Sequence, residues 1–296
     1  MIGVLGGKVM QVTGNGAVIV GKFTDISPDV EIVFLCSEGV VHIGDYCRIS
    51  AKVKIIVNHG SVFIDDWTAI HDGCLLLCSK FLKIGQHCWF GQHCVLDGSA
   101  GLTIGNSVRV GMYSQIWSHV SAGEQFEGCI LNAEKPVNIE DNVWLIGSCI
   151  CSPGVILGRF AVALSQSNIT KSVAEYQVVA GSPASLKPKM SFYKKITLKQ
   201  KFNLLTDWLY QFNYKHNQKY DIKLSSKKVQ ISSSSEKIQF FCSSVDNHES
   251  KKKNKLTQNI SVDLEAKIYT KKHTTLEKTL FQFFSNNKVR FLRDDG

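Results

Sequence analysis

The stretch Ile104–Trp144, IGNSVRVGMYSQIWSHVSAGEQFEGCILNAEKPVNIEDNVW, sets a six-residue rhythm and then interrupts it shortly after a histidine. Successive six-residue units begin with the apolar residues Ile104, Val110 and Ile116. The interruption follows His119 and runs from Val120 to Asn138. A period of six fits neither an amphipathic helix, with a period of 3.6, nor a half-buried strand, with a period of two. The stretch therefore predicts a short structural repeat.

The same rhythm extends through most of the first two thirds of the chain. The apolar residues that lead the hexads form six triplets: Ile43, Ile49, Ile55; Ile64, Ile70, Leu76; Ile84, Phe90, Leu96; Ile104, Val110, Ile116; Ile139, Leu145, Cys151; Leu157, Ala163, Ile169. Three hexads per coil predict a triangular solenoid with three flat faces. A coil of three hexads needs eighteen residues. Where a coil is longer, the extra residues always fall between its third hexad and the first hexad of the next coil. They are expected on one edge, and the longest excess follows His119.

A resemblance to a known family begins at the end of the interruption. The stretch Glu134–Ala184, EKPVNIEDNVWLIGSCICSPGVILGRFAVALSQSNITKSVAEYQVVAGSPA, resembles the closing segment of hexapeptide-repeat acyltransferases of the maltose and galactoside O-acetyltransferase type. It is also similar to their relatives that O-acetylate capsule and lipopolysaccharide sugars. The resemblance covers roughly residues 23 to 189. It implies a mainly β chain folded as a left-handed parallel β-helix, a homotrimer, and acetyl-CoA as co-substrate with no metal.

Charge and patterning divide the chain into four segments. We predict an N-terminal strand cap over residues 1–22, the β-helix over 23–189, an amphipathic helix over 190–216 and a small basic α+β domain over 217–296. Residues 190–296 hold 21 of the 34 Lys and Arg and 10 of the 25 Asp and Glu, so they carry +11 against −2 for the rest. The basic excess therefore belongs to the C-terminal part, in which no family resemblance is apparent.

Ten cysteines raise the question of disulfides or metal binding. Five of them share the fifth position of a hexad, where a small inward-facing residue is needed: Cys47, Cys74, Cys88, Cys94 and Cys149. They are interpreted as small core residues. The chain has no CxxC pair, no signal peptide and no transmembrane segment by sequence, which favours a reducing cytoplasm.

His119 is the predicted catalytic residue. It lies at the fourth position of its hexad in the motif IWSH, which resembles the family's histidine motif ahead of its long loop. Imidazole can accept a proton near neutral pH, as attack by a sugar hydroxyl on a thioester requires. A structural corner histidine is the alternative. Val120 departs from the family pattern, in which many relatives have proline or a second histidine two residues on.

The resemblance also implies a set of binding residues. Trp144 would line the cleft for acetyl-CoA and the acceptor, although simple corner packing is the alternative, and the Gly147 N–H would face the thioester oxygen. Cofactor-binding positions are Trp144, Gly147, Ser165, Thr170, Lys171 and Lys187. The arginines that many relatives place after the exit motif are replaced by Ser185 and Pro188, with Lys187 and Lys189 displaced by one position.

Two further groups of residues are candidates for binding roles. Asp97 roughly matches an acidic contact to sugar hydroxyls in relatives, but an ordinary turn aspartate ahead of Gly98 is an equal alternative. His59, His71, His87 and His93 invite a metal interpretation, because a carbonic anhydrase of this fold binds zinc through three histidines. His87 and His93 are one hexad apart and hence on different faces, so no metal site is expected.

These observations predict an acetyl-CoA-dependent O-acetyltransferase acting on a sugar hydroxyl of a bacterial surface polysaccharide or its precursor. Transfer would be direct, because no nucleophilic Ser or Cys is paired with His119 in the motif. The alternatives are an N-acetyltransferase for an amino sugar and a β-helical scaffold without catalytic activity. The basic C-terminal part favours an anionic polysaccharide as partner and not nucleic acid. Its lysines could equally serve only to keep that part soluble.

Overall fold

The computed structural model describes residues 4–5, 8–242, 259–286 and 288–294. The chain divides into two compact units, Met1–Tyr193 and Lys194–Gly296. Among the described residues, no helix is both long and apolar enough to cross a membrane.

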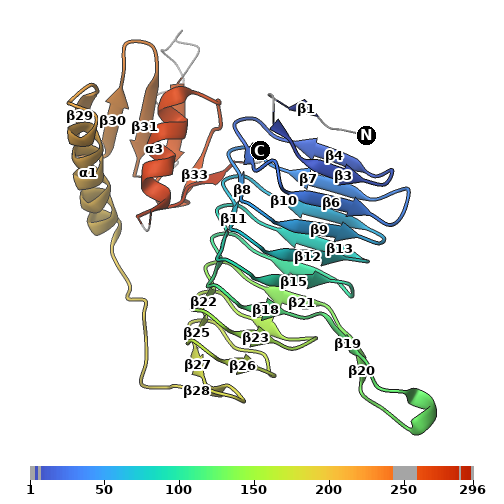
Figure 1. The fold of residues 1–296 in the computed structure, drawn as a ribbon. Helices are drawn as coiled ribbons and strands as arrows, with labels where there is room; N and C mark the ends of the chain where they lie inside the picture. Colours follow the sequence, from blue (N-terminus) through green and yellow to red (C-terminus); the bar gives the residue numbers. More distant parts are fainter. Residues whose placement is uncertain (1–3, 6–7, 243–258, 287, 295–296) are drawn as a thin grey trace. The chain divides into compact units, whose positions relative to one another are not determined.

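The first unit is a parallel β-helix with three faces, and each coil contributes one strand to each face (Figure 1). Face 1 consists of β4 (Ala17–Val20), β7 (Val40–Ile43), β10 (Ser61–Ile64), β13 (Phe81–Ile84), β16 (Leu102–Ile104), β21 (Val137–Ile139) and β24 (Ile156–Leu157). Face 2 consists of β5 (Asp25–Ile26), β8 (Arg48–Ile49), β11 (Ala69–Ile70), β14 (Trp89–Phe90), β17 (Arg109–Val110), β22 (Trp144–Leu145), β25 (Val162–Ala163), β27 (Val178–Ala180) and β28 (Ser185–Leu186). Face 3 consists of β3 (Gln11–Thr13), β6 (Glu31–Phe34), β9 (Lys54–Val57), β12 (Leu75–Cys78), β15 (Val95–Gly98), β18 (Gln115–Ile116), β23 (Ile150–Cys151) and β26 (Asn168–Ile169).

The core of the β-helix is built from the residues that lead the hexads. All eighteen of them are at most 3% exposed. Adjacent coils are in register, so that Leu76 of β12 pairs with Leu96 of β15 and Ile116 of β18 with Cys151 of β23. Each leading residue therefore stacks on its counterpart in the next coil. The six-residue period is confirmed as the signal that determines the fold.

The N-terminal segment differs from the prediction. Strands β1 (Val4–Leu5) and β2 (Lys8–Val9) form an antiparallel hairpin, as expected of a cap. However, β3 and β4 pair in parallel with β6 and β7 and so belong to faces 3 and 1. The coils thus begin at Gln11 and not near residue 23. The repeat is hard to recognise here because Gly14 and Gly16 interrupt it in sequence.

The edge between faces 3 and 1 carries the extra residues, as predicted. In three coils they lengthen the strands on both sides of the corner, as in β9 and β10, instead of bulging outward. The run after Ile116 projects from this edge: β19 (His119–Ser121) and β20 (Asn132–Glu134) form an antiparallel hairpin around the short 3-10 helix η1 (Gln125–Glu127) (Figure 1). We call this edge the hairpin edge.

The C-terminal unit is a six-stranded sheet with two described helices, α1 (Leu198–Lys215) and α3 (Thr275–Ser285). The strands follow the order β29 (Asp221–Leu224), β30 (Lys228–Ser232), β31 (Lys237–Phe241), β32 (Asn259–Asp263), β33 (Ile268–Tyr269) and β34 (Leu292–Arg293). The single strand expected over residues 260–268 is two strands, because a turn interrupts it after Asp263. The polar run Asp246–Lys255 lies outside the described residues.

Both helices begin at the capping boxes expected from the sequence. Thr197 exchanges hydrogen bonds with Gln200 at the start of α1, and Thr274 does so with Glu277 at the start of α3. Leu205, Leu209 and Phe212 of α1 are buried, and Phe212 contacts Phe283 of α3. The helix α1 is therefore part of the C-terminal unit, and the separate segment predicted over 190–216 is not one. Its apolar stripe packs within that unit.

Candidate functional site

His119 lies where the hairpin leaves the β-helix, at the first residue of β19. Its ring Nδ1 is 2.7 Å from Oδ2 of Asp97, a residue of the preceding coil on face 3. The Asp97 side chain is fully buried, whereas the His119 side chain is 36% exposed. The Nδ1 side of the imidazole is therefore held by a buried carboxylate, while the ring remains accessible to a ligand.

Several donors converge on Asp97. Oδ2 accepts hydrogen bonds from the backbone N–H of Ser118 (2.8 Å), from the Ser118 hydroxyl (3.0 Å) and from the backbone N–H of His119 (3.1 Å). Oδ1 accepts one from the backbone N–H of Ser99 (3.0 Å). Burial raises the pKa of Asp97, but the hydrogen bonds from Ser99, His119 and Ser118 outweigh it and leave the pKa below the usual value. Asp97 is thus a carboxylate at neutral pH.

An ionised Asp97 has consequences for the tautomer of His119. A carboxylate only accepts hydrogen bonds, so His119 donates from Nδ1–H when the ring is neutral. The lone pair of the neutral imidazole is then on Nε2, the nitrogen that Asp97 does not contact. This arrangement allows the ring to take a proton at Nε2 while Asp97 stabilises the resulting imidazolium.

The structure corrects the role that the sequence suggested for Asp97. A fully buried carboxylate whose two oxygens already accept backbone and side-chain hydrogen bonds cannot contact a sugar hydroxyl. Asp97 instead contacts the ring and the backbone of His119. It is also more than a turn aspartate, since it links Ser99 with Ser118 and His119 of the next coil.

Two residues of this arrangement were not identified from the sequence. Ser118 is buried, and its hydroxyl both donates to Asp97 and accepts from the backbone N–H of Ala100 (2.9 Å). Trp117 lies beside His119, with ring centroids 6.2 Å apart in an edge-on arrangement, and its indole N–H donates to Gln115. The register offered a signal: Leu96 pairs with Ile116, so Asp97 must lie next to Trp117 and its successors.

The structure divides the other predicted site residues into two groups. Thr170 and Lys171 directly follow β26, so they lie on the hairpin edge with His119 and are exposed. Trp144 is 38% exposed on β22 of face 2, the face opposite that edge. Ser165 and Gly147 lie at the corner between faces 2 and 3, and Lys187 follows β28 on face 2. A single chain therefore does not bring Trp144 and Gly147 to His119.

Gly147 offers a hydrogen-bond donor. In the described part of the chain its backbone N–H makes no hydrogen bond, whereas its neighbours Ile146 and Ser148 donate to carbonyls of adjacent coils. Its own carbonyl accepts from Gln166, one coil further along. Lys187 is held differently, because its ammonium group is 3.1 Å from the Ser185 hydroxyl. An unused backbone N–H is the type of donor that can stabilise a developing oxyanion.

The described residues contain no cluster of three or more His, Cys, Asp or Glu side chains arranged to hold a metal ion. The four histidines considered for a metal site lie apart from His119, on other coils. His87 stacks on Trp67 with parallel rings, and His93 stacks on Tyr113 in the same way. These two rings therefore serve packing at the corners of the β-helix.

Comparisons with known proteins find relatives among acetyltransferases. Nodulation protein L of Rhizobium meliloti (strain 1021) is 34% identical over 108 residues, which are 36% of this chain and 58% of that protein. Galactoside O-acetyltransferase of Lactococcus lactis subsp. lactis (strain IL1403) is 24% identical over 188 residues, 62% of this chain and 81% of that protein. No protein-family model matches the chain. The chain thus spans little more than half of the first of these relatives.

Solved structures give the same fold. The polysialic acid O-acetyltransferases NeuO and OatWY each superpose with a TM-score of 0.50, at 17% and 19% identity. Each comparison covers 64% of this chain, with 92% of NeuO and 93% of OatWY. The matched share corresponds in size to the first unit, Met1–Tyr193. In sequence and in its left-handed parallel β-helix, the chain therefore resembles the hexapeptide-repeat acetyltransferases.

Proposed function

We propose that the protein is an acetyl-CoA-dependent O-acetyltransferase that acts on a sugar hydroxyl of a bacterial surface polysaccharide or its precursor. The observation that carries the proposal is the Asp97–His119 pair at the root of the hairpin. It combines a buried carboxylate with a half-exposed imidazole whose Nε2 is available as a base. A scaffold protein has no need of such a pair. The sugar-acetylating relatives support the choice of acceptor.

In the proposed reaction His119 acts as general base. Its Nε2 takes the proton of the acceptor hydroxyl as the oxygen attacks the thioester carbonyl of acetyl-CoA, and Asp97 stabilises the imidazolium that forms. The N–H of Gly147 stabilises the oxyanion of the tetrahedral intermediate. When the intermediate collapses, the C–S bond breaks and the thiolate of coenzyme A takes the proton from His119. No acyl-enzyme forms, because the acceptor hydroxyl attacks the thioester directly and no side chain of the protein serves as the nucleophile.

The proposal requires two copies of the chain at each site. Trp144 and Gly147 lie away from the hairpin edge, so their proposed roles at the thioester can be met only by a neighbouring subunit. A homotrimer with three equivalent grooves satisfies this requirement. Thr170 and Lys171 on the hairpin edge, together with Ser165 and Lys187, are the proposed contacts to the pantetheine and phosphates of acetyl-CoA. Lysine serves a phosphate as a point charge.

The test is acetyl transfer from acetyl-CoA to capsule and O-antigen fragments by the wild type and by His119→Ala. Loss of a general base is expected to lower the rate about 10² to 10⁴-fold. Assembly and the affinity for acetyl-CoA should remain nearly unchanged. His59→Ala is the matched control, because His59 is exposed in an earlier turn of the same edge. Activity of His119→Ala within threefold of wild type would exclude the assigned base.

A further inference from the structure

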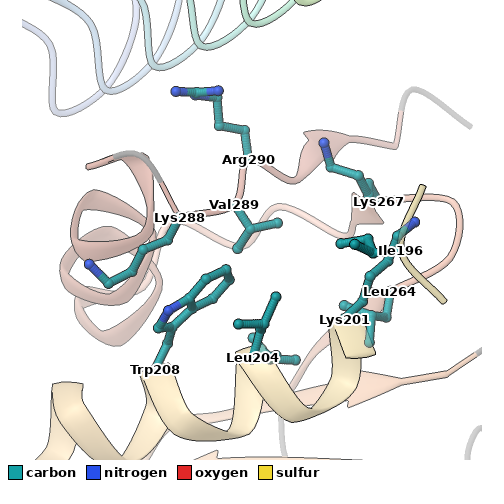
Figure 2. A pocket seen from close by; sticks show the side chains of 10 residues that line it. Ile196, Lys201, Leu204, Trp208, Leu264, Lys267, Lys288, Val289 and Arg290 are labelled. Carbon is teal, nitrogen blue, oxygen red and sulfur yellow. The ribbon is translucent and has the colours of Figure 1, made fainter. Parts of the chain in front are cut away.

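The C-terminal unit contains a cavity of about 190 Å³ between α1 and the chain that follows α3. Its apolar lining residues include Leu205, Leu264 and Val289. In Figure 2 the side chains of Leu204 and Trp208 rise from α1 towards Val289. All lining residues belong to the unit Lys194–Gly296, so the cavity is independent of the β-helix.

Four cationic residues are among those that line the cavity: Lys201, Lys267, Lys288 and Arg290. None of the described residues that line the cavity is acidic. The side chains of all four are half-buried, so their charges are less well screened than those of fully exposed lysines. The ammonium group of Lys288 lies over the Phe283 ring of α3 at 4.5 Å, at the margin of the cavity. The cavity therefore offers an apolar platform with a positive rim.

Size and composition narrow the class of ligand. Typical small-molecule pockets enclose roughly 300–1,000 Å³, so this smaller cavity suits a group of monosaccharide size. A pyranose ring has apolar C–H faces that can lie on an indole such as Trp208, and a carboxylate on the ring can bind the ammonium groups of Lys201 and Lys288. Single-stranded nucleic acid is less suited, because its binding sites present a series of aromatic side chains and this cavity has one.

We propose that this cavity binds one carboxylated sugar unit of an anionic polysaccharide and so holds the acceptor polymer on the enzyme. The inference rests on the proposed function for its biological role, but the binding itself does not depend on catalysis. The net charge of +11 on the same unit would increase the local concentration of such a polymer. The cavity supplies what net charge alone lacks, a defined place for one sugar ring.

The first experiment is calorimetric titration of the full chain with oligosialic acid. Controls are a neutral maltooligosaccharide of equal length and inorganic phosphate. The oligosialic acid should bind, and the other two should bind much more weakly. Equal binding of the neutral sugar would overturn the role of the cationic rim. Equal binding of phosphate would reduce the site to an anion site and would also overturn the proposal.

Two sets of variants locate the binding. Lys201→Gln combined with Lys288→Gln should weaken oligosialic acid binding roughly tenfold, since each charge contact contributes modestly. Trp208→Leu should weaken it by a similar factor at high salt as well, because stacking is not screened. The matched control is Lys199→Gln combined with Lys272→Gln. These substitutions remove the same charge at two exposed lysines outside the cavity. Equal weakening by the control pair would mean that only net charge matters.

Kinetics separate this inference from the proposed function. The cavity variants should raise KM for polymeric acceptor about tenfold, while kcat and the KM for acetyl-CoA stay unchanged. Transfer to a single-sugar acceptor should also stay unchanged. If the wild type transfers no acetyl group at all, the proposed function fails, yet the titrations still decide the cavity. If transfer is normal and all cavity variants match the wild type in binding, the cavity proposal alone is wrong.

Discussion

A single oxygen of Asp97, Oδ2, accepts hydrogen bonds from both the ring Nδ1 (2.7 Å) and the backbone N–H (3.1 Å) of His119. This double contact fixes the ring and the strand start that carries it at the same time. The hairpin β19–β20 thus leaves the β-helix from a point that is tied to the preceding coil. Flexibility further along the hairpin need not disturb the imidazole.

Asp97→Asn should therefore lower kcat strongly while changing the KM for acetyl-CoA little. An asparagine keeps the size of the side chain but removes the negative charge that stabilises the imidazolium, and its NH2 group must face either the N–H donors of Ser118 and His119 or that of Ser99. The expected loss is about 10² to 10⁴-fold, the range for general-base catalysis. Steady-state kinetics with near-UV circular dichroism as a check on folding is the measurement. A kcat within threefold of wild type would contradict the positioning role.

The lowered pKa of Asp97 also predicts a contribution to stability that depends on pH. Burial raises this pKa, but the hydrogen bonds from Ser99, His119 and Ser118 lower it by more. A carboxyl group whose pKa is lower in the folded than in the unfolded chain stabilises the fold above its unfolded pKa, about 3.9 for Asp. That contribution is lost as the pH falls through the folded pKa.

Thermal unfolding of wild type and Asp97→Asn between neutral pH and pH about 3 tests this point. The wild type should lose Tm more steeply below the ordinary pKa of Asp, so that the difference between the two proteins narrows with acid. Other carboxyl groups titrate in both proteins and cancel in the comparison. A constant difference across this range would mean that Asp97 is not a stabilising carboxylate.

The fold was predictable because its signal is periodic and local. The eighteen leading residues of the hexads each occupy an inward position, and one register error would expose a whole coil. The N-terminal coil was missed because Gly14 and Gly16 replace side chains that mark the rhythm. In the C-terminal unit, helix starts at Thr197 and Thr274 were predictable from their capping boxes. The cavity beside Trp208 was not, because tertiary packing creates it.

The site was predictable only in part. The motif was enough to propose His119 as the base, but the contact between Asp97 and His119 depends on which residues the coils place side by side. The two are 22 residues apart, close to but not equal to one coil of 20, and the offset carries the histidine past the corner. Whether Asp97 faces solvent or the buried side of the edge is a matter of side-chain packing, which a sequence pattern alone does not contain.

The cysteines provide a further prediction. The five at the fifth position of a hexad are buried, and each thiol donates to a carbonyl, as Cys74 does to Gly91 (3.0 Å) and Cys88 to Gly105 (3.0 Å). Burial raises the pKa of the Cys47 thiol, whereas the hydrogen bond with Cys94 lowers the pKa of Cys74, so the protection of Cys74 depends on its burial alone. The five should be protected in the native state.

Labelling with a thiol reagent, followed by mass spectrometry of peptides, tests this protection. All ten cysteines should react in denaturant, since all are free thiols. In the native protein Cys36, Cys129 and Cys242, which are partly exposed, should react first. Rapid native labelling at Cys94 or Cys149 would show that the coils open more readily than their packing indicates.

The last prediction concerns the shared site. If His119 of one subunit works with Trp144 of its neighbour, His119→Ala and Trp144→Ala should complement each other when expressed together. Each variant alone should be inactive or nearly so. In a closed ring of randomly mixed chains, about one quarter of the grooves would combine an intact His119 with an intact Trp144. Co-expression should then restore about one quarter of wild-type activity.

The control is co-expression of His119→Ala with Asp97→Asn. These two residues touch each other within one chain, so a working site needs both of them intact in the same chain. Neither variant chain has both, and no activity should return. If acetyl transfer returns in the first pair but not in the second, the site is built from two subunits. If neither pair shows acetyl transfer although light scattering confirms trimers, Trp144 does not act at the groove of the neighbouring subunit. Its exposed ring would then be a packing feature of face 2.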